Sequence, residues 1–67
     1  MDVMARLVSI REDRKIPQLT VAKRMGWGQS SISKLEKKLA KNIRVGDLQR
    51  YAEALGVAVT VEIDDPA

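Results

Sequence analysis

Residues 18–36 read QLTVAKRMGWGQSSISKLE, and this stretch decides the fold. Two short segments with helical hydrophobic spacing, 18–25 and 29–38, flank a glycine-rich connection at 26–28. A glycine directly after a helical segment supplies a left-handed stop, so the first helix is predicted to end before Gly26. We expect the second helix to run to Lys38 and to turn three side chains inward, Ile32, Leu35 and Leu39.

The second segment is small and polar wherever it does not face inward. A helix with only a structural role would favour alanine, glutamate and leucine at these positions, whereas this one carries QSS at 29–31 and SK at 33–34. Glutamine can bond adenine bidentately, serine can donate or accept, and lysine seeks guanine or phosphate. Two helices joined by a short glycine-containing turn form a helix-turn-helix, whose second helix enters the major groove of DNA. The pattern therefore predicts a recognition helix over 29–38.

Two further helices and a strand are predicted outside this stretch. Periodicity favours helices over about 2–14 and 45–55, the first capped by Asp2. The tail then alternates with period two, which predicts a strand over 57–63. Nothing else in the chain alternates in this way, so the strand is expected to pair with the same strand of a second copy across a two-fold axis. The alternatives are a frayed tail or an extended segment on its own helices. The apolar face of the strand consists of Val57, Val59, Val61 and Ile63.

Length and composition exclude several classes of protein. A chain of 67 residues forms at most one domain, here divided into a helical body, 1–56, and a strand with an acidic tail, 57–67. There is no cysteine and no histidine, which excludes disulfides, zinc fingers and Ser–His or Cys–His catalysis. No apolar run approaches the roughly 18 residues that span a bilayer. We expect a soluble, cytoplasmic protein without cofactor, metal or enzyme activity.

Charge is segregated along the chain. From Arg14 to Arg44 there are nine basic residues and one acidic residue, a net +8, whereas the preceding residues carry −1 and the following ones −4. A basic middle between neutral and acidic ends indicates a face that binds a polyanion. The alternative is a solvated, lysine-rich surface.

The stretch quoted first resembles the Xre family of helix-turn-helix regulators, which includes the lambdoid phage repressors and Cro proteins. The shared pattern is Gln18, Ala22, Gly26 and then the run from Gln29 to Glu36. The resemblance extends from about Leu7 to Gly56, and the segment 45–56 followed by a strand resembles the HigA-type antitoxins. Together, these resemblances imply a mainly α fold. The expected fold is a four-helix Cro/repressor-like helix-turn-helix domain with one C-terminal β-strand that pairs across a homodimer.

The resemblance also implies roles for individual residues. The residues implied to reach base edges are Gln29, Ser30, Ser33 and Lys34. Those implied to contact the DNA backbone are Gln18, Lys38, Lys41 and Arg44, with the minor groove as an alternative for Arg44. Arg11 and Glu36 occupy positions where related repressors hold an ion pair. Helical spacing agrees, because it places Arg11 on the apolar face of its helix.

Five residues depart from the family pattern or have a mixed character. Pro17 stands where a capping residue is usual, so that cap is expected to be missing or rearranged. Gly28 replaces the usual capping serine of the recognition helix, which costs only about a few tenths of a kcal/mol. Trp27 replaces a smaller apolar residue and is expected to fill the core between the two motif helices, with DNA contact as the alternative. Leu19 replaces a polar residue and either packs against a partner or is a lone surface leucine. Tyr51 is expected in the core with its hydroxyl reaching solvent.

Three functions follow as hypotheses. The first is a dimeric, sequence-specific repressor that binds a palindromic operator on double-stranded DNA, in a prokaryote or phage, at the nucleoid. The second is a HigA-type antitoxin that neutralises a toxin protein and represses its own operon. The third is a small protein-binding module whose basic face takes an acidic partner.

Overall fold

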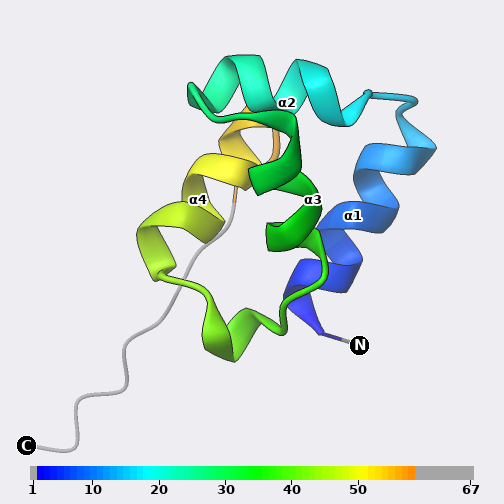
Figure 1. The fold of residues 1–67 in the computed structure, drawn as a ribbon. Coiled ribbons are helices and arrows are strands. Elements are labelled where there is room, and N and C mark those ends of the chain that lie inside the picture. The colour runs from blue at the N-terminus through cyan, green and yellow to red at the C-terminus, as the bar shows by residue number, and fades with distance from the viewer. Residues whose placement is uncertain (1, 59–67) are drawn as a thin grey trace, which may run out of the picture.

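The computed structural model describes residues 2–58, and these form a bundle of four α-helices with one 3-10 turn. The helices are α1 (Val3–Asp13), α2 (Gln18–Met25), α3 (Gln29–Glu36) and α4 (Val45–Ala54), and the 3-10 turn η1 (Ala40–Asn42) precedes α4. Figure 1 shows α2 crossing one end of the bundle and η1 closing the other. Within the described residues there is no strand.

The core is built from the apolar face of each α-helix. α2 packs against both α3 and α4, and α1 packs against α3. Because every helix contributes side chains at helical spacing, one contiguous cluster forms between them. The buried members of this cluster are Met4, Leu7, Val21, Ala22, Met25, Ile32, Leu35, Leu48, Tyr51, Ala52, Ala54 and Leu55.

Asp2 is the N-cap of α1 and also links α1 to η1. Its Oδ2 accepts from the backbone N–H of Met4 over 3.0 Å, and its carboxylate also accepts from the N–H of Ala40, 38 residues away, over 3.1 Å. α2 and α3 start differently: their N-caps, Pro17 and Gly28, make no side-chain hydrogen bond. The expected loss of the side-chain cap at Pro17 is therefore confirmed.

The predicted end of the third helix was wrong. α3 ends at Glu36, two residues before Lys38, and the expected inward residue Leu39 is 50% exposed. The backbone N–H groups of Lys37 and Lys38 bond to the carbonyls of Lys34 and Leu35, three residues earlier, and these bonds close the helix. The chain then turns, and Ala40 bonds to Asp2. This contact comes from the other end of the chain, so local periodicity could not show it.

The end of α4 ties the following residues to the core. Gly56 adopts a positive φ of 78°, and the N–H of Val57 bonds to the carbonyl of Ala52 over 2.9 Å, as in a glycine-based helix stop. Val57 is half-buried against the core, and neither it nor Ala58 is in a strand. The rest of the predicted strand, Val59–Ile63, lies outside the described residues. None of the helices described is long and apolar enough to cross a membrane.

Candidate nucleic-acid interface

The turn between α2 and α3 sets the angle of the second motif helix. Gly26 has a φ of 72°, and the N–H of Trp27 bonds to the carbonyl of Ala22 over 2.8 Å. This pair of features is a Schellman stop, which ends α2 sharply and lets α3 start after a three-residue turn. Both helix bounds at this turn agree with the sequence prediction.

The residues expected to reach bases lie on α3, and most of them face solvent. Gln29, Ser30 and Lys34 are exposed, whereas Ser33 is half-buried on the flank nearer the core. Ser31 was not among the candidates, yet it is exposed on the opposite flank. Its place in the small, polar run at 29–31 is the signal that could have pointed to it.

The residues expected to reach the DNA backbone divide into two groups. Lys38, Lys41 and Arg44 are exposed along the segment that joins α3 to α4. Gln18 is half-buried at the start of α2, and its Nε2 donates to Glu36 Oε1 over 2.8 Å. One of its amide hydrogens is therefore committed to the protein.

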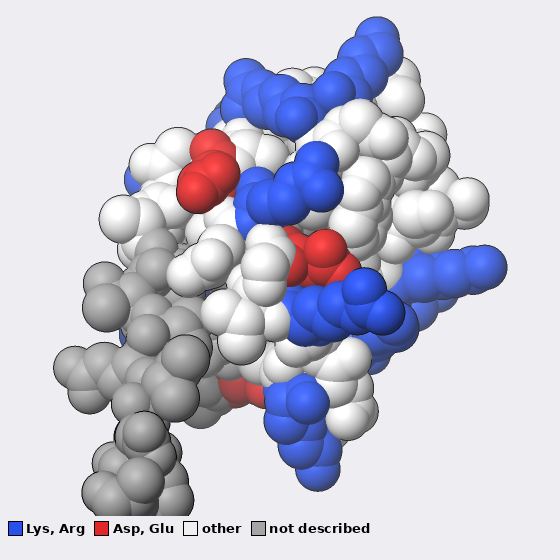
Figure 2. Space-filling view, turned by 90° about the vertical axis from the view of Figure 1, so that its left-hand side faces the viewer, with Lys and Arg blue, Asp and Glu red and all other residues white. Residues whose placement is uncertain are grey.

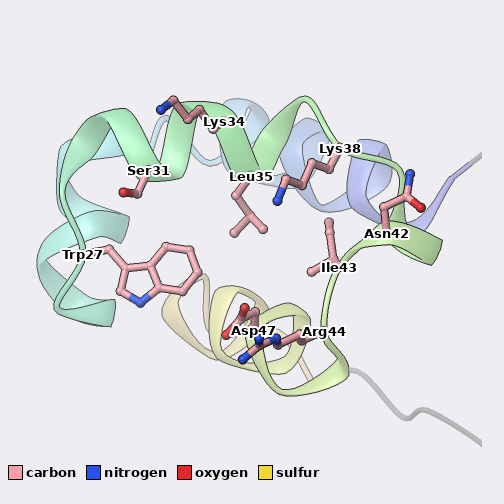
Figure 3. Close-up of a pocket in the computed structure, with 9 residues that line it drawn as sticks. All are labelled: Trp27, Ser31, Lys34, Leu35, Lys38, Asn42, Ile43, Arg44 and Asp47. Atoms are coloured by element: carbon pink, nitrogen blue, oxygen red, sulfur yellow. The ribbon is translucent and has the colours of Figure 1, made fainter.

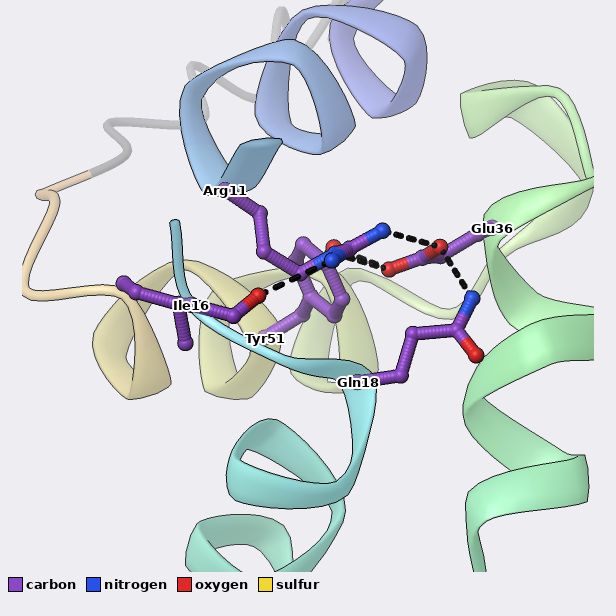
Figure 4. Close-up of polar contacts among 5 residues, drawn as sticks. All are labelled: Arg11, Ile16, Gln18, Glu36 and Tyr51. Carbon is purple, nitrogen blue, oxygen red and sulfur yellow. Dashed lines mark hydrogen bonds and ion pairs between the residues drawn. The ribbon is translucent and has the colours of Figure 1, made fainter. Parts of the chain in front are cut away.

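Glu36 is the centre of a polar network that joins α1, α2, α3 and α4. Arg11 Nε donates to Glu36 Oε2 over 2.7 Å, and Arg11 Nη2 donates to Oε1 over 3.1 Å. Tyr51 Oη donates to Oε2 over 2.6 Å, and Arg11 also donates to the carbonyl of Ile16. Figure 4 shows these groups converging on the one carboxylate. The prediction for the Tyr51 hydroxyl was wrong: Tyr51 is fully buried, and its hydroxyl binds Glu36 instead of water.

The network keeps both partners charged although little of either is exposed. Burial by itself raises the pKa of Glu36, but hydrogen bonds from Tyr51, Arg11 and Gln18 outweigh burial and hold this pKa below its ordinary value. Burial and the hydrogen bond to Glu36 raise the pKa of Tyr51. Burial lowers the pKa of Arg11, and the bond to Glu36 more than reverses this. A carboxylate that is largely shielded from solvent and accepts four hydrogen bonds fixes the helices relative to one another.

Three arginines bind helix ends. Arg14 and Arg24 donate to the carbonyls of Leu55 and Ala54 at the end of α4, over 2.8 and 2.6 Å. Arg50 donates to the carbonyl of Met25 at the end of α2 over 2.7 Å. Cations here satisfy carbonyls that a helix end leaves without partners. The charge of the basic middle segment is therefore not all on one face, since Arg14 and Arg24 stabilise the end of α4.

A groove of about 320 Å³ runs between α3 and the start of α4. Trp27 lines it and is half-buried against the core, so it fills the core only in part. Figure 3 shows its indole directed into the space between the two helices. Basic side chains gather around the face drawn in Figure 2, with a few acidic ones between them. The described residues contain no cluster of side chains suited to hold a metal ion.

The short α2–α3 turn and the exposed polar side of α3 define a helix-turn-helix DNA-binding protein. Residues 7–61 match the family model HTH_3, described as Helix-turn-helix, and the chain belongs to this Xre/Cro-like family of DNA-binding regulators. The match does not separate a HigA-type branch from the rest of the family. No curated protein and no solved structure matches the chain.

Proposed function

We propose that this protein is a sequence-specific transcriptional repressor that binds a palindromic operator as a homodimer. The observation that carries the proposal is the exposed polar side of α3, held in place by the network around Glu36. Side chains can read bases only when their helix is rigidly oriented toward the groove. With two copies, two such helices would enter successive major grooves about 34 Å apart.

Base reading is assigned to α3 and backbone contact to the surrounding basic residues. Gln29, Ser30, Ser33 and Lys34 are the proposed base-reading residues. Gln18, Lys38, Lys41 and Arg44 are the proposed backbone residues. The second amide hydrogen of Gln18 would serve this contact while the first remains on Glu36. Arg11 and Glu36 contribute through the orientation of the helices.

Selection of binding sites from random duplex DNA tests this proposal. An enriched inverted repeat is expected at near-physiological salt. Gln29→Ala should then relax the preference at one base pair per half-site, by about 1–3 kcal/mol. Lys41→Ala should weaken all sequences alike and flatten the salt dependence. If no sequence is enriched, or if Gln29→Ala leaves the preferred sequence unchanged, the assignment of α3 as the reading helix fails.

The homodimer is proposed to form through the alternating segment Val57, Val59, Val61 and Ile63. The segment starts beside α1, because Val57 and Ala58 line a mostly apolar groove with Val3, Leu7 and Ile10. Pairing of two copies would satisfy the backbone edge and shield the apolar side chains.

Removal of residues 59–67 is the appropriate test, because Val57 packs against the core of the helical body and must be kept. The shortened chain should sediment as a monomer and bind the operator far more weakly, with an unchanged helical circular dichroism spectrum. A shortened chain that stays dimeric would refute the strand model.

An antitoxin role is the second candidate, and Leu19 is the observation that favours it. This side chain is 46% exposed on α2, at a position where the family pattern has a polar residue. A toxin surface could cover it. The test is whether the chain relieves growth arrest caused by the protein of an adjacent gene, and whether Leu19→Lys abolishes that relief while operator binding persists. If the chain gives no such relief, the antitoxin role fails and the repressor function is the one that remains.

A further inference from the structure

The groove between α3 and α4 has an apolar lining that the base-reading role does not require. Its apolar side chains are Leu35, which is 5% exposed, and the half-buried Trp27 and Ile43. Trp27 comes from the α2–α3 turn, Leu35 from α3, and Ile43 from the segment before α4. Figure 3 shows the three side chains directed into one space. The groove therefore offers a wall of apolar surface beside the recognition helix.

Cations and neutral polar groups surround this apolar wall. Lys34, Lys38 and Arg44 contribute positive charge, and Ser31 and Asn42 contribute a hydroxyl and an amide. The one carboxylate in the lining belongs to Asp47, in the first turn of α4. An anion would thus be favoured toward α3 and disfavoured beside Asp47.

This combination matches the chemistry of a sugar–phosphate chain. Deoxyribose presents a mostly apolar ring that packs on an aromatic face, while each phosphate carries one negative charge for lysine or arginine. Hydroxyl and amide groups are common donors to phosphate oxygens and fix the register of the protein on the duplex. An acidic peptide would satisfy the cations too. DNA is favoured because Lys34 lines the groove and also lies on the exposed side of α3 with Gln29 and Ser30.

We propose that this groove binds the sugar–phosphate backbone of one operator strand, and that the indole of Trp27 packs against its deoxyribose. Trp27 is then a further DNA-binding residue, with Ser31 and Asn42 as donors to the same strand. The proposal rests on the proposed function, since it requires α3 to lie in the major groove. It accounts for a large side chain at a position where the family pattern has a small apolar one.

The single tryptophan of the chain provides a direct readout. The full-length protein is mixed with the duplex obtained by site selection, and binding is followed independently by anisotropy of a dye on the DNA. Quenching of Trp27 fluorescence by acrylamide should fall at least about twofold in the complex, because the packed strand excludes the quencher. Unchanged quenching in a complex that anisotropy shows to be saturated would overturn the proposal.

Two neighbouring lysines provide a matched pair of variants. Lys38 lines the groove and Lys37 does not, although both are exposed and equally charged. Lys38→Ala should weaken binding and restore part of the quenching of Trp27 in the saturated complex, whereas Lys37→Ala should leave this quenching unchanged. Equal effects of the two variants on quenching would contradict the proposed strand position.

Substitution of Trp27 tests its own contribution. Trp27→Val should weaken operator binding roughly five- to tenfold, the size of one aromatic contact, and Trp27→Phe should lose less. Both variants are compared at a temperature where circular dichroism shows them folded. If Trp27→Val does not fold, the affinity of the Phe variant and the quenching of the wild-type protein still test the role of Trp27. A folded Val variant with wild-type affinity would overturn the role of Trp27.

The outcomes separate this inference from the proposed function. If no duplex binds at all, the proposed function fails and the inference fails with it. If the selected duplex binds and Trp27 stays accessible, only the inference fails. A polyglutamate peptide serves as the other probe. If it protects Trp27 and duplex DNA does not, the groove binds an acidic protein segment and the DNA assignment is wrong.

Discussion

At the residue scale, Glu36 shows how one carboxylate can organise a small protein. It accepts hydrogen bonds from Arg11, Gln18 and Tyr51, which come from three other helices. Loss of one partner from such a buried pair costs about 3–5 kcal/mol, because the other charge remains without compensation. For a domain of this size, which has only a few kcal/mol of stability, that is most of the total.

The lowered pKa of Glu36 predicts acid sensitivity. Because its pKa in the folded state lies below the ordinary value near 4.5, the unfolded chain binds a proton first as pH falls. The contribution of Glu36 to stability is thus complete above that value and is lost as pH drops through the folded pKa. Urea unfolding between pH 7 and pH 3 should show a steep loss for wild type. Glu36→Gln should be less stable at pH 7 and less dependent on pH, and an equal dependence would contradict this account.

Lys15 carries a backbone conformation that its side chain disfavours. It has a φ of 57° directly after α1, where its N–H bonds to Glu12 and the N–H of Ile16 bonds to Arg11. This is the position of a helix stop at which glycine is usual. Lys15→Gly should therefore raise the free energy of unfolding by about 0.5–1 kcal/mol. Lys23→Gly, inside α2, is the control and should lower the free energy of unfolding by about 1 kcal/mol. Thermal melts of both variants and the wild type measure these changes.

At the element scale, α1 and the segment after α3 are connected by Asp2. This residue caps α1 and also binds the N–H of Ala40, the first residue of η1. η1 carries Lys41 and leads to Arg44, two of the proposed backbone-binding residues. The start of the chain therefore helps to place a segment proposed to lie on DNA.

Asp2→Ala should lower the free energy of unfolding by about 1–2 kcal/mol, since it removes the cap of α1 and the bond to Ala40 together. Asp2→Asn should lose much less, because an amide oxygen can still accept at a cap. Chemical denaturation measures the free energy of unfolding of both variants. Hydrogen exchange at the Ala40 amide should accelerate in the Ala variant, and exchange at the wild-type rate would exclude the proposed link.

At the scale of the whole molecule, position in the fold decides what each positive charge does. Arg14 and Arg24 satisfy carbonyls at the end of α4, whereas Lys38, Lys41 and Arg44 lie near its other end. Figure 1 shows these two ends of α4 on different sides of the bundle. The net charge of the basic segment therefore overstates the charge available to one strand of DNA.

The slope of operator affinity against salt should separate these two groups of cations. Lys41→Ala should reduce the slope of log K against log salt by about 1, the value for one lost phosphate contact. Arg24→Ala should lower the unfolding midpoint, since Ala54 loses its partner, but leave the slope unchanged. Titrations at four or more salt concentrations measure the slopes, and a reduced slope in the Arg24 variant would place this residue on the DNA.

Much of the fold followed from local signals in the chain. Helical spacing located the four helices, and Gly26 and Gly56 marked two of their ends. The spacing of the motif also identified the family that the match over 7–61 shows. These signals are local because a helix is decided by hydrogen bonds and side-chain patterns within a few residues.

The tertiary structure alone decided several other features. These are the end of α3, the partner of the Tyr51 hydroxyl and the positions of Arg14 and Trp27. Each depends on a group distant along the chain: Ala40 binds Asp2, Tyr51 binds Glu36, and Arg14 binds Leu55. Hydrophobic periodicity predicts which face of a helix a side chain lies on. The hydrogen-bond partner of its polar group depends on which groups the packed helices bring close to it. The sequence by itself therefore determined the helices and the family, and the packing of those helices decided which polar groups hold the body together and which remain exposed on its surface.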